Sequence, residues 1–362
     1  MNFEEALKEI KGLDKKALEQ SRIHWDSIAK PLRSLGLLEE AVIKMAGITG
    51  NIKVELKKKA LIIMCADNGV VKENVTQTGC EVTASVTENF TKEKATVSIM
   101  SKAAGVDLFP VDIGIYRDME NSLKEDEEIK PFRILDRKIA YGTENMFEGP
   151  AMSREQAIKA IEVGINLVKH MKESGYNIIA TGEMGIGNTT TSSAIASVLL
   201  NEDVEKVTGR GAGLSSDGLQ RKINVIKESI RVNKPDINDP IDVLSKLGGY
   251  DIAGLVGVFI GGAVYRIPIV IDGFISAVSA LIASKIEPKI TDYMLPSHVS
   301  KEPAGKMLLD ALNLKPFITC EMCLGEGSGA VALYPILDMA CAVYNEMSNF
   351  EEAGVKQYKP LT

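Results

Sequence analysis

The chain has 362 residues, of which 45% are hydrophobic and 25% are charged. This composition is ordinary for a globular protein and argues against disorder. The length predicts about two domains, or one large α/β domain with an appendage. The 42 basic and 49 acidic residues give a net charge of −7. A general nucleic-acid binder is therefore disfavoured, because such a surface repels phosphate groups at long range.

We expect neither a membrane span nor a secretory signal. The longest apolar run, residues 252–264, falls short of the roughly 18 residues that a span needs, and its glycines favour a core helix. The N-terminus, residues 1–5, is acidic and has no basic or apolar signal region. The five cysteines are an odd number, which favours reduced thiols and a cytoplasmic location over a disulfide framework.

The first fifty residues are predicted to be helical. Apolar residues recur at steps of three and four from Ala6 to Leu18, which places them on one helix face. A second helix is expected over residues 28–45, with Pro31 near its start. Together these helices would form a small helical element before the first strand.

Five apolar runs then predict buried strands. They span residues 60–66, 106–115, 177–181, 267–271 and 317–324. Each ends near a glycine and an acidic residue. Because helical patterns separate several of these runs, the sequence predicts a parallel, layered α/β sheet. In such sheets ligands bind outside the carboxyl ends of the strands.

The clearest helical pattern covers residues 153–172. Ser153 and Gln156 form a capping box at its start, and Gly164 lies within its apolar stripe, where it would let a neighbouring element approach closely. By contrast, residues 117–130 are charged and lack a stripe, so we expect a surface loop there.

The segment 182–190, Gly-Glu-Met-Gly-Ile-Gly-Asn-Thr-Thr, follows a predicted strand and precedes a helix rich in small residues. Glycines let backbone amides approach an anion, and a helix N-terminus favours negative charge. Two interpretations are open: a phosphate-binding turn, or a tight turn capped by Thr189 or Thr190. The segment is not a P-loop, because no Gly-Lys-Ser/Thr follows.

Residues 209–213, Gly-Arg-Gly-Ala-Gly, precede a helical stretch that carries Lys222. Their amides, with Arg210 and Lys222, would complete an anion site. The alternative is a flexible loop beside a solvated helix face.

The segment 324–329, Leu-Gly-Glu-Gly-Ser-Gly, precedes an apolar helix over residues 330–347, in which Pro335 marks a start or a kink. Glu326 stands between two glycines, so its carboxylate is sterically open and would reach a substrate as a general base. The alternative is a turn residue favoured by the helix N-terminus.

Two further features carry less specific signals. The segment around His298 has two interpretations. Either the imidazole donates a hydrogen bond to a ligand, or Ser297 or Ser300 caps a helix. The pair Cys320 and Cys323 has Cys-x-x-Cys spacing but lies in an apolar run without a second pair. We therefore interpret the two cysteines as structural core and predict no metal site.

The sequences of these segments and their order along the chain resemble the nicotinate-nucleotide:dimethylbenzimidazole phosphoribosyltransferase family of cobalamin lower-ligand assembly. The segments that carry the resemblance are 65–70, 111–114, 182–190, 249–252, 267–274, 297–302 and 324–329. The resemblance implies a Rossmann-like parallel sheet with flanking helices, a small helical domain from both chain ends, and a homodimer. The implied division is 1–50 and 330–362 for the small domain and 51–329 for the large catalytic domain.

The family resemblance also implies the reaction. Phosphoribose would pass from nicotinate mononucleotide to a nitrogen of 5,6-dimethylbenzimidazole or a related base, giving α-ribazole 5′-phosphate and nicotinate without a cofactor. Glu326 matches the family's catalytic carboxylate and would take the azole proton, with Glu183 in support. The phosphoribosyl site would comprise Gly185, Gly187, Asn188, Thr189, Lys222 and Ser300, and the base pocket Thr78, Val86 and Leu324.

Two positions depart from the family pattern. Asn68 stands where the family often has histidine, and Val86 is apolar where a polar side chain often lines the base pocket. Other benzimidazoles, purines and phenolic acceptors therefore stay open. A hydrolase acting on the same nucleotide and a non-catalytic nucleotide-binding paralogue are the competing functions. The apolar setting predicted for Glu326 speaks against the hydrolase, and the presence of both Glu183 and Glu326 against the paralogue.

Overall fold

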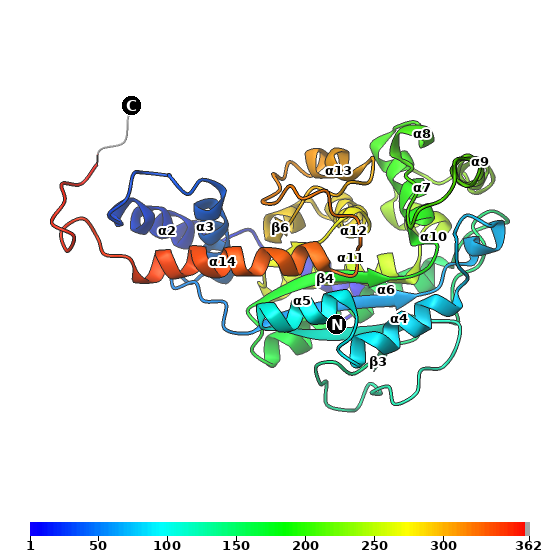
Figure 1. The fold of residues 1–362 in the computed structure, drawn as a ribbon, viewed down its shortest axis with the longest axis horizontal. Coiled ribbons are helices and arrows are strands. Elements are labelled where there is room, and N and C mark those ends of the chain that lie inside the picture. The colour runs from blue at the N-terminus through cyan, green and yellow to red at the C-terminus, as the bar shows by residue number, and fades with distance from the viewer. Residues whose placement is uncertain (359–362) are drawn as a thin grey trace.

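The computed structural model describes residues 1–358, and its centre is a six-stranded parallel sheet (Figure 1). The strands lie in the order β3-β2-β1-β4-β5-β6. Their bounds are β1 Lys59–Ala66, β2 Val106–Gly114, β3 Leu135–Asp136, β4 Ile178–Met184, β5 Ile269–Ile271 and β6 Met294–Pro296. This is the Rossmann order, which reverses between β1 and β4. The predicted α/β fold class is confirmed.

The helices cover both faces of the sheet. In chain order they are α1 Phe3–Glu9, α2 Lys15–Ser27, α3 Leu37–Thr49, α4 Glu81–Thr91, α5 Thr96–Ala104, α6 Arg154–Glu173, α7 Asn188–Leu200, α8 Val204–Val207, α9 Ser216–Asn233, α10 Pro240–Leu247, α11 Tyr250–Tyr265, α12 Phe274–Ile286, α13 Gly305–Ala311 and α14 Ser328–Glu346. Two 3₁₀ helices, η1 Gly69–Glu73 and η2 Pro288–Tyr293, complete the elements.

Strand β1 shows why the sheet is buried on both sides. All eight of its residues are buried. Ile62 and Met64 point into a core shared with α6, α11 and α12, whereas Leu61 and Ile63 point into a core shared with α3, α5 and α14. Alternate side chains of a strand face opposite sides of a sheet, so a strand covered on both sides is apolar throughout.

Four of the five predicted strands are found as β1, β2, β4 and β5. The fifth, at 317–324, is wrong: only Ile318 makes an isolated bridge, to His298, and the sheet's last strand is β6. The backbone turns at Glu321, whose φ is +51°, and this breaks the extended run. Cys320 and Cys323 are exposed, so their interpretation as core is also wrong. The expected loop at 117–130 holds no helix or strand, apart from an isolated bridge at Leu123.

The N-terminal helices begin and end differently from the prediction. The expected single helix over 6–18 is two helices, because α1 ends at Glu9 and Asp14 caps a new helix by accepting the Ala17 N–H at 2.9 Å. The helix expected over 28–45 begins only at α3. Pro31 has no N–H to donate, and the chain turns through residues 29–36 before Gly36, with a φ of +54°, precedes the helix.

The two chain ends meet beside the sheet. The rings of Trp25 and Tyr344 lie 5.0 Å apart, and Ile28 bridges to Asn349, so α2 and α3 pack with the end of α14 (Figure 1). Helix α1, however, packs on α6 and α11, and the Phe3 N–H donates to Glu162 at 2.9 Å. The division at residues 50 and 329 stays a prediction.

Glycines allow α6 and α11 to touch backbone to backbone. A β-carbon on Gly164 would lie 2.1 Å from the carbonyl oxygen of Gly254, and one on Gly257 would lie 1.9 Å from that of Ile161. The expected close approach at Gly164 is confirmed. Residues 250–263 of α11 are all buried, which agrees with the predicted core helix. Across residues 1–358, no helix has the length and apolar character to span a bilayer.

We predict that Gly257→Ala lowers the free energy of unfolding by about 1–3 kcal/mol, because the added methyl group must force two packed backbones apart. Urea unfolding measures the change. Gly12→Ala is the matched control, since no atom lies within 4 Å of its β-carbon position. Equal stabilities of the two variants would contradict the tight α6–α11 contact.

Candidate active site

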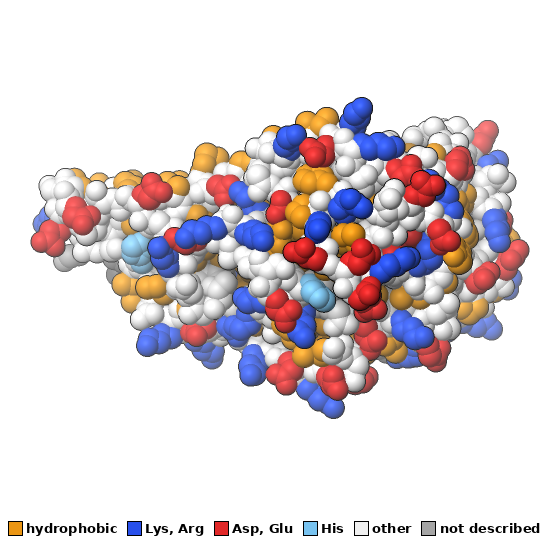
Figure 2. Space-filling view, turned by 90° about the horizontal axis from the view of Figure 1, so that it is seen from below, with side chains coloured by type: hydrophobic (Ala, Val, Ile, Leu, Met, Phe, Trp, Pro, Cys, Tyr) orange, Lys and Arg blue, Asp and Glu red, His pale blue; other side chains and the backbone are white. Residues whose placement is uncertain are grey.

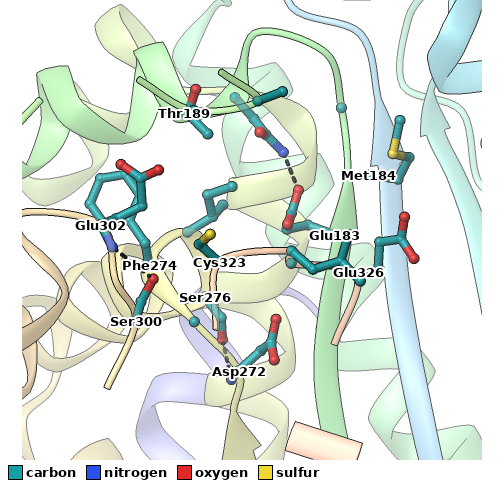
Figure 3. A pocket seen from close by; sticks show the side chains of 18 of the residues that line it. Glu183, Met184, Thr189, Asp272, Phe274, Ser276, Ser300, Glu302, Cys323 and Glu326 are labelled. Carbon is teal, nitrogen blue, oxygen red and sulfur yellow. Dashed lines mark hydrogen bonds between the residues drawn. The ribbon is translucent and has the colours of Figure 1, made fainter. Parts of the chain in front are cut away.

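A cavity of about 230 Å³ opens beyond the carboxyl ends of β4, β5 and β6 (Figure 3). Its wall is formed by residues from five segments: 183–189, 211–212, 272–276, 298–302 and 323–326. The strands bring these segments together from distant parts of the chain, as expected at the carboxyl edge of a parallel sheet.

Seven of the predicted site residues lie in the cavity wall. They are Glu183, Gly185, Asn188, Thr189, Ser300, Leu324 and Glu326. Lys222 lies directly behind the wall, where its ammonium donates to Thr189. Gly187 faces Val71 and Asn68 instead. Thr78, which is exposed, and Val86, on α4, are not in the wall, so their contact with a base stays a prediction.

Glu326 lies in a sharp turn between the loop and α14. Gly325, Glu326 and Gly327 all have left-handed backbones, with φ of +84°, +61° and +86°. Burial raises the pKa of the Glu326 carboxyl, and the charge of Asp272 adds to this rise. A hydrogen bond from the Val97 N–H lowers the pKa by less than burial raises it. Its Oε2 atom is buried without a hydrogen-bond partner among the described residues. A carboxylate of this kind is a stronger base than a solvated one.

Glu183 belongs to a buried carboxyl pair. The Asn188 side-chain N–H₂ donates to Glu183 and, at 2.9 Å, to Asp251 Oδ2; a dashed line in Figure 3 marks the hydrogen bond that Glu183 accepts. Burial and then the charge of Asp251 raise the pKa of Glu183 to about 8, while burial raises that of Asp251 to about 6. The pair therefore retains a proton near neutral pH.

The start of α7 forms a corner of the cavity whose geometry suits an anion. Gly187, with a φ of +96°, is the residue before the helix, and no side chain caps the first turn. The prediction that Thr189 or Thr190 provides the cap is wrong, because the glycine takes that position. Within the first turn, the Asn188 and Thr190 N–H groups donate to the Gly185 and Gly187 carbonyls at 3.1 and 2.9 Å, whereas the Thr189 N–H has no acceptor among the described residues. A free N–H at a helix N-terminus favours an anion there.

Lys222 supplies the positive charge beside this corner. Its Nζ atom donates to Thr189 Oγ1 at 2.8 Å and to the Gly209 carbonyl at 3.2 Å. Burial lowers its pKa to about 8, although the nearby Glu302 favours the charged form. Arg210 instead donates to the Leu214 carbonyl and to Ser216. Of these two basic residues, only Lys222 contacts the start of α7.

His298 lies in the cavity wall. Its Nδ1 atom is 3.1 Å from Ser297 Oγ, and its ring is close enough to Asp272 to lower that carboxyl's pKa, although burial raises it more. Neither Ser297 nor Ser300 caps a helix, since Ala304 precedes α13. The placement agrees with a side chain that faces a ligand.

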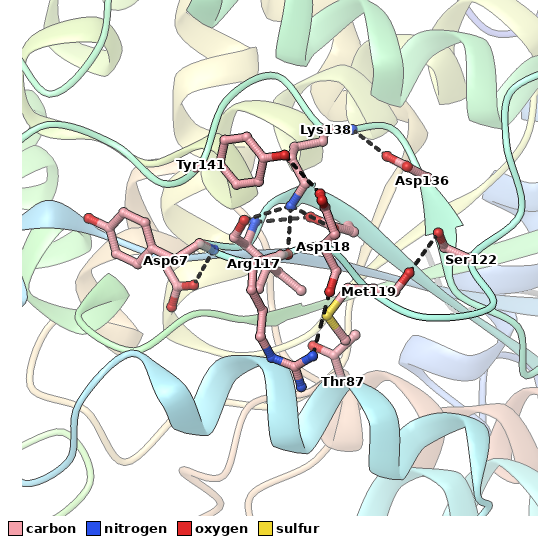
Figure 4. Close-up of polar contacts among 12 residues, drawn as sticks. Asp67, Thr87, Arg117, Asp118, Met119, Ser122, Asp136, Lys138 and Tyr141 are labelled. Carbon is pink, nitrogen blue, oxygen red and sulfur yellow. Dashed lines mark hydrogen bonds and ion pairs between the residues drawn. The ribbon is translucent and has the colours of Figure 1, made fainter.

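A second polar cluster lies outside the cavity, at the ends of β1 and β2 (Figure 4). Lys138 pairs with Asp112 at 2.8 Å and donates to the Ile115 carbonyl at 2.6 Å. Asp67 accepts the Tyr116 N–H at 2.8 Å. These contacts fix the loop that follows β2 and leave the buried acids of β4 and β5 to face the cavity.

The comparisons with known proteins agree with this geometry. A family model described as "Phosphoribosyltransferase" matches residues 10–355. Relatives named nicotinate-nucleotide–dimethylbenzimidazole phosphoribosyltransferase, from Ruminiclostridium cellulolyticum and Clostridium acetobutylicum, are 50% and 49% identical over 361 residues and covered in full, as is this chain. The crystal structure of CobT from Thermus thermophilus superposes with a TM-score of 0.86 at 33% identity, covering 95% of this chain and 100% of that one.

The chain belongs to the nicotinate-nucleotide–dimethylbenzimidazole phosphoribosyltransferase family. The family resemblance drawn from the sequence is thereby confirmed. The start of α7 and the Glu326 carboxyl group line one cavity of this phosphoribosyltransferase. On the face shown in Figure 2, basic and acidic side chains alternate and leave no extended field of one sign.

Sequence reasoning missed three polar residues of this phosphoribosyltransferase site. Asp272 and Glu302 line the cavity, and Asp251 shares the Asn188 amide with Glu183. Asp272 had a signal, because it directly follows a predicted strand. Asp251 lies in the segment 249–252 that carries the family resemblance, but no local pattern indicated its partnership with Glu183. Among residues 1–358, no group of three or more His, Cys, Asp or Glu side chains could hold a metal ion.

We predict that Glu183→Gln changes how stability depends on pH. Because the folded state holds this proton up to about pH 8 and the unfolded chain releases it near its ordinary value, the wild type loses stability as the pH rises between these values. The variant should lose less, as measured by urea unfolding at pH 5, 7 and 8. Glu128→Gln, at a side chain that is 84% exposed, should match the wild type. Identical slopes for Glu183→Gln and wild type would contradict the assignment.

Proposed function

We propose that this enzyme transfers the phosphoribosyl group of nicotinate mononucleotide to 5,6-dimethylbenzimidazole or a related base, with Glu326 as general base. The observation that carries the proposal is the buried, unpartnered Glu326 Oε2 in a cavity that also holds the uncapped start of α7. The names of the relatives support the two substrates.

The phosphate of the nucleotide fits the corner at the start of α7. The Thr189 N–H, the Thr189 hydroxyl and Ser300 offer hydrogen bonds, and Lys222 offers positive charge from behind the wall. A phosphate dianion would also favour the ammonium form of Lys222, whose pKa burial lowers. The ribose would then lie between this corner and the Glu326 turn.

The proposed chemistry is a displacement at the ribose C1′ carbon. One base nitrogen forms the new bond to C1′ while the bond to the nicotinate nitrogen breaks, and that nitrogen leaves neutral because it was a pyridinium in the donor. Glu326 takes the proton from the other base nitrogen. Attack from the opposite face converts the β-nucleotide into an α-product. Orientation within the cavity would supply much of the rate.

Glu183 has a supporting role in this proposal. With a pKa of about 8 it is protonated at pH 7, so its carboxyl is neutral and does not compete with Glu326 for the proton. The neutral group also lowers the total negative charge next to an anionic substrate.

We further propose that the enzyme is a cytoplasmic homodimer. The dimer rests on the resemblance to the family. The cytoplasmic location rests on the free state of all five cysteines, which is typical of a reducing compartment. Leu324, 52% exposed in the cavity wall, is proposed to contact the base, and Thr78 and Val86 are proposed to complete its pocket.

We predict that Glu326→Gln lowers kcat by about 10²–10⁴-fold, the usual contribution of a general base. Nicotinate release and the ribosylated product are followed with nicotinate mononucleotide and a panel of benzimidazoles, adenine and phenols. Glu321→Gln, at an exposed side chain of the same loop, is the control and should keep wild-type kcat.

The same assay separates the competing functions. Release that needs an added base supports the transferase and identifies its acceptor. Release without any base would mean a hydrolase, and the absence of release under every condition would leave a binding paralogue. A variant with wild-type kcat would remove Glu326 from its proposed role.

We predict that Lys222→Met weakens binding of nicotinate mononucleotide by about 10- to 150-fold, since a hydrogen bond to a charged group contributes about 1.5–3 kcal/mol. Calorimetric titration measures the dissociation constant. Nicotinate riboside, which lacks the phosphate, serves as the control ligand, and its affinity should not change. An equal loss for both ligands would argue against a phosphate contact.

A further inference from the structure

Asp272 is buried at the end of β5, next to the turn that carries Glu326. Its carboxylate accepts three backbone N–H groups, from Gly327 at 3.1 Å, Gly329 at 2.7 Å and Ala330 at 3.0 Å. These amides belong to the residue after Glu326 and to the first turn of α14. One side chain thus holds the whole junction between the turn and the helix.

The turn needs such support because its backbone is unfavourable. A left-handed backbone costs about 1–2 kcal/mol for a residue with a β-carbon, and Glu326 adopts it between two glycines. Strand β4 presses on the turn from the other side: a β-carbon on Gly182 would lie 2.7 Å from the Glu326 carbonyl oxygen. Strain of this kind persists only where the surroundings hold it.

Asp272 is itself fixed by two serines. Its N–H donates to Ser276 Oγ at 3.2 Å, and Ser297 Oγ donates to its carbonyl at 3.0 Å. Ser276 in turn lies 2.6 Å from the Thr181 hydroxyl on β4. The position of the carboxylate is therefore fixed relative to three adjacent strands, β4, β5 and β6.

We propose that Asp272 is the positioning residue for Glu326: it holds the turn at 325–327 so that the Glu326 carboxylate lies in the cavity. The inference rests on the proposed role of Glu326 as the base. Asp272 needs no contact with the substrate for this role.

The charge of Asp272 adds a second, measurable effect. The charged or titratable side chains around Glu326 are Glu183 on β4, Asp272 after β5 and, beyond Asp272, His298 after β6, and the Val97 N–H faces it from α5. Of these, Asp272 acts to raise the pKa of Glu326. Removing the charge should lower that pKa, so the acid limb of the kcat profile should move to lower pH.

The test is Asp272→Asn in the full-length enzyme. The amide keeps the shape of the carboxylate but sets an N–H₂ group against at least one of the three N–H donors, which displaces the turn. We expect kcat to fall about ten- to hundredfold, as a misplacement of about 1 Å can cause, with the KM for nicotinate mononucleotide little changed and the acid limb shifted downward. Asp272→Ser, which leaves one acceptor at most, should show the same split.

Asp239→Asn is the matched control, because this aspartate also accepts backbone N–H groups at the start of a helix, those of Ile241 and Asp242, and lies outside the cavity wall. It should keep kcat near the wild type. Thermal melting and binding of nicotinate mononucleotide show whether each variant is folded. A folded Asp272→Asn enzyme with wild-type kcat and pH profile would overturn the inference, as would an equal rise in KM and fall in kcat.

Glu326→Gln distinguishes this failure from that of the proposed function. If Glu326→Gln is inactive and Asp272→Asn is not impaired, only the positioning role is lost. If Glu326→Gln keeps wild-type kcat, the proposed base itself is wrong.

Discussion

The carboxyl edge of the sheet gathers acidic groups that are buried without ion-pair partners. Glu183, Asp251, Asp272 and Glu326 all have a pKa raised chiefly by desolvation, and none of them is in an ion pair in the described part of the chain. Amide groups hold them instead: the side chain of Asn188 and the backbone at 327–330. These amides favour the ionised form of the carboxyls, but desolvation outweighs them and raises each pKa. The edge thus keeps a capacity for protons near neutral pH, which acid–base chemistry needs.

Close backbone contact is the second requirement of this architecture. Glycines carry it where layers meet, at Gly257 between two helices and at Gly182 between β4 and the Glu326 turn. At both places a single methyl group would collide with a carbonyl oxygen. The core and the site therefore use the same kind of packing. In both, a glycine lets two backbone segments approach more closely than a side chain would allow.

The sequence was informative where a local pattern sufficed. Apolar runs located β1, β2, β4 and β5, the Ser153 capping box located α6, and the motifs located Glu183, Asn188 and Glu326 in one wall. It failed where three-dimensional context decides. The run at 317–324 is as apolar as a strand but turns at Glu321. The partnership of Asp251 with Glu183 joins residues that no short pattern connects, and the position of Gly187 rather than Thr189 at the α7 start depends on backbone dihedrals.

Helix α14 links the turn that carries Glu326 to the N-terminal helices. Its first turn is attached to Asp272, and its last turns pack on α2 beside Tyr344. At about 1.5 Å per residue, this 19-residue helix is a rod of nearly 30 Å. In the order of synthesis, Asp272 leaves the ribosome before Gly327, Gly329 and Ala330, whose N–H groups it accepts. The Glu326 turn can therefore be anchored only after the start of α14 has been made, although the aspartate that holds it is already present.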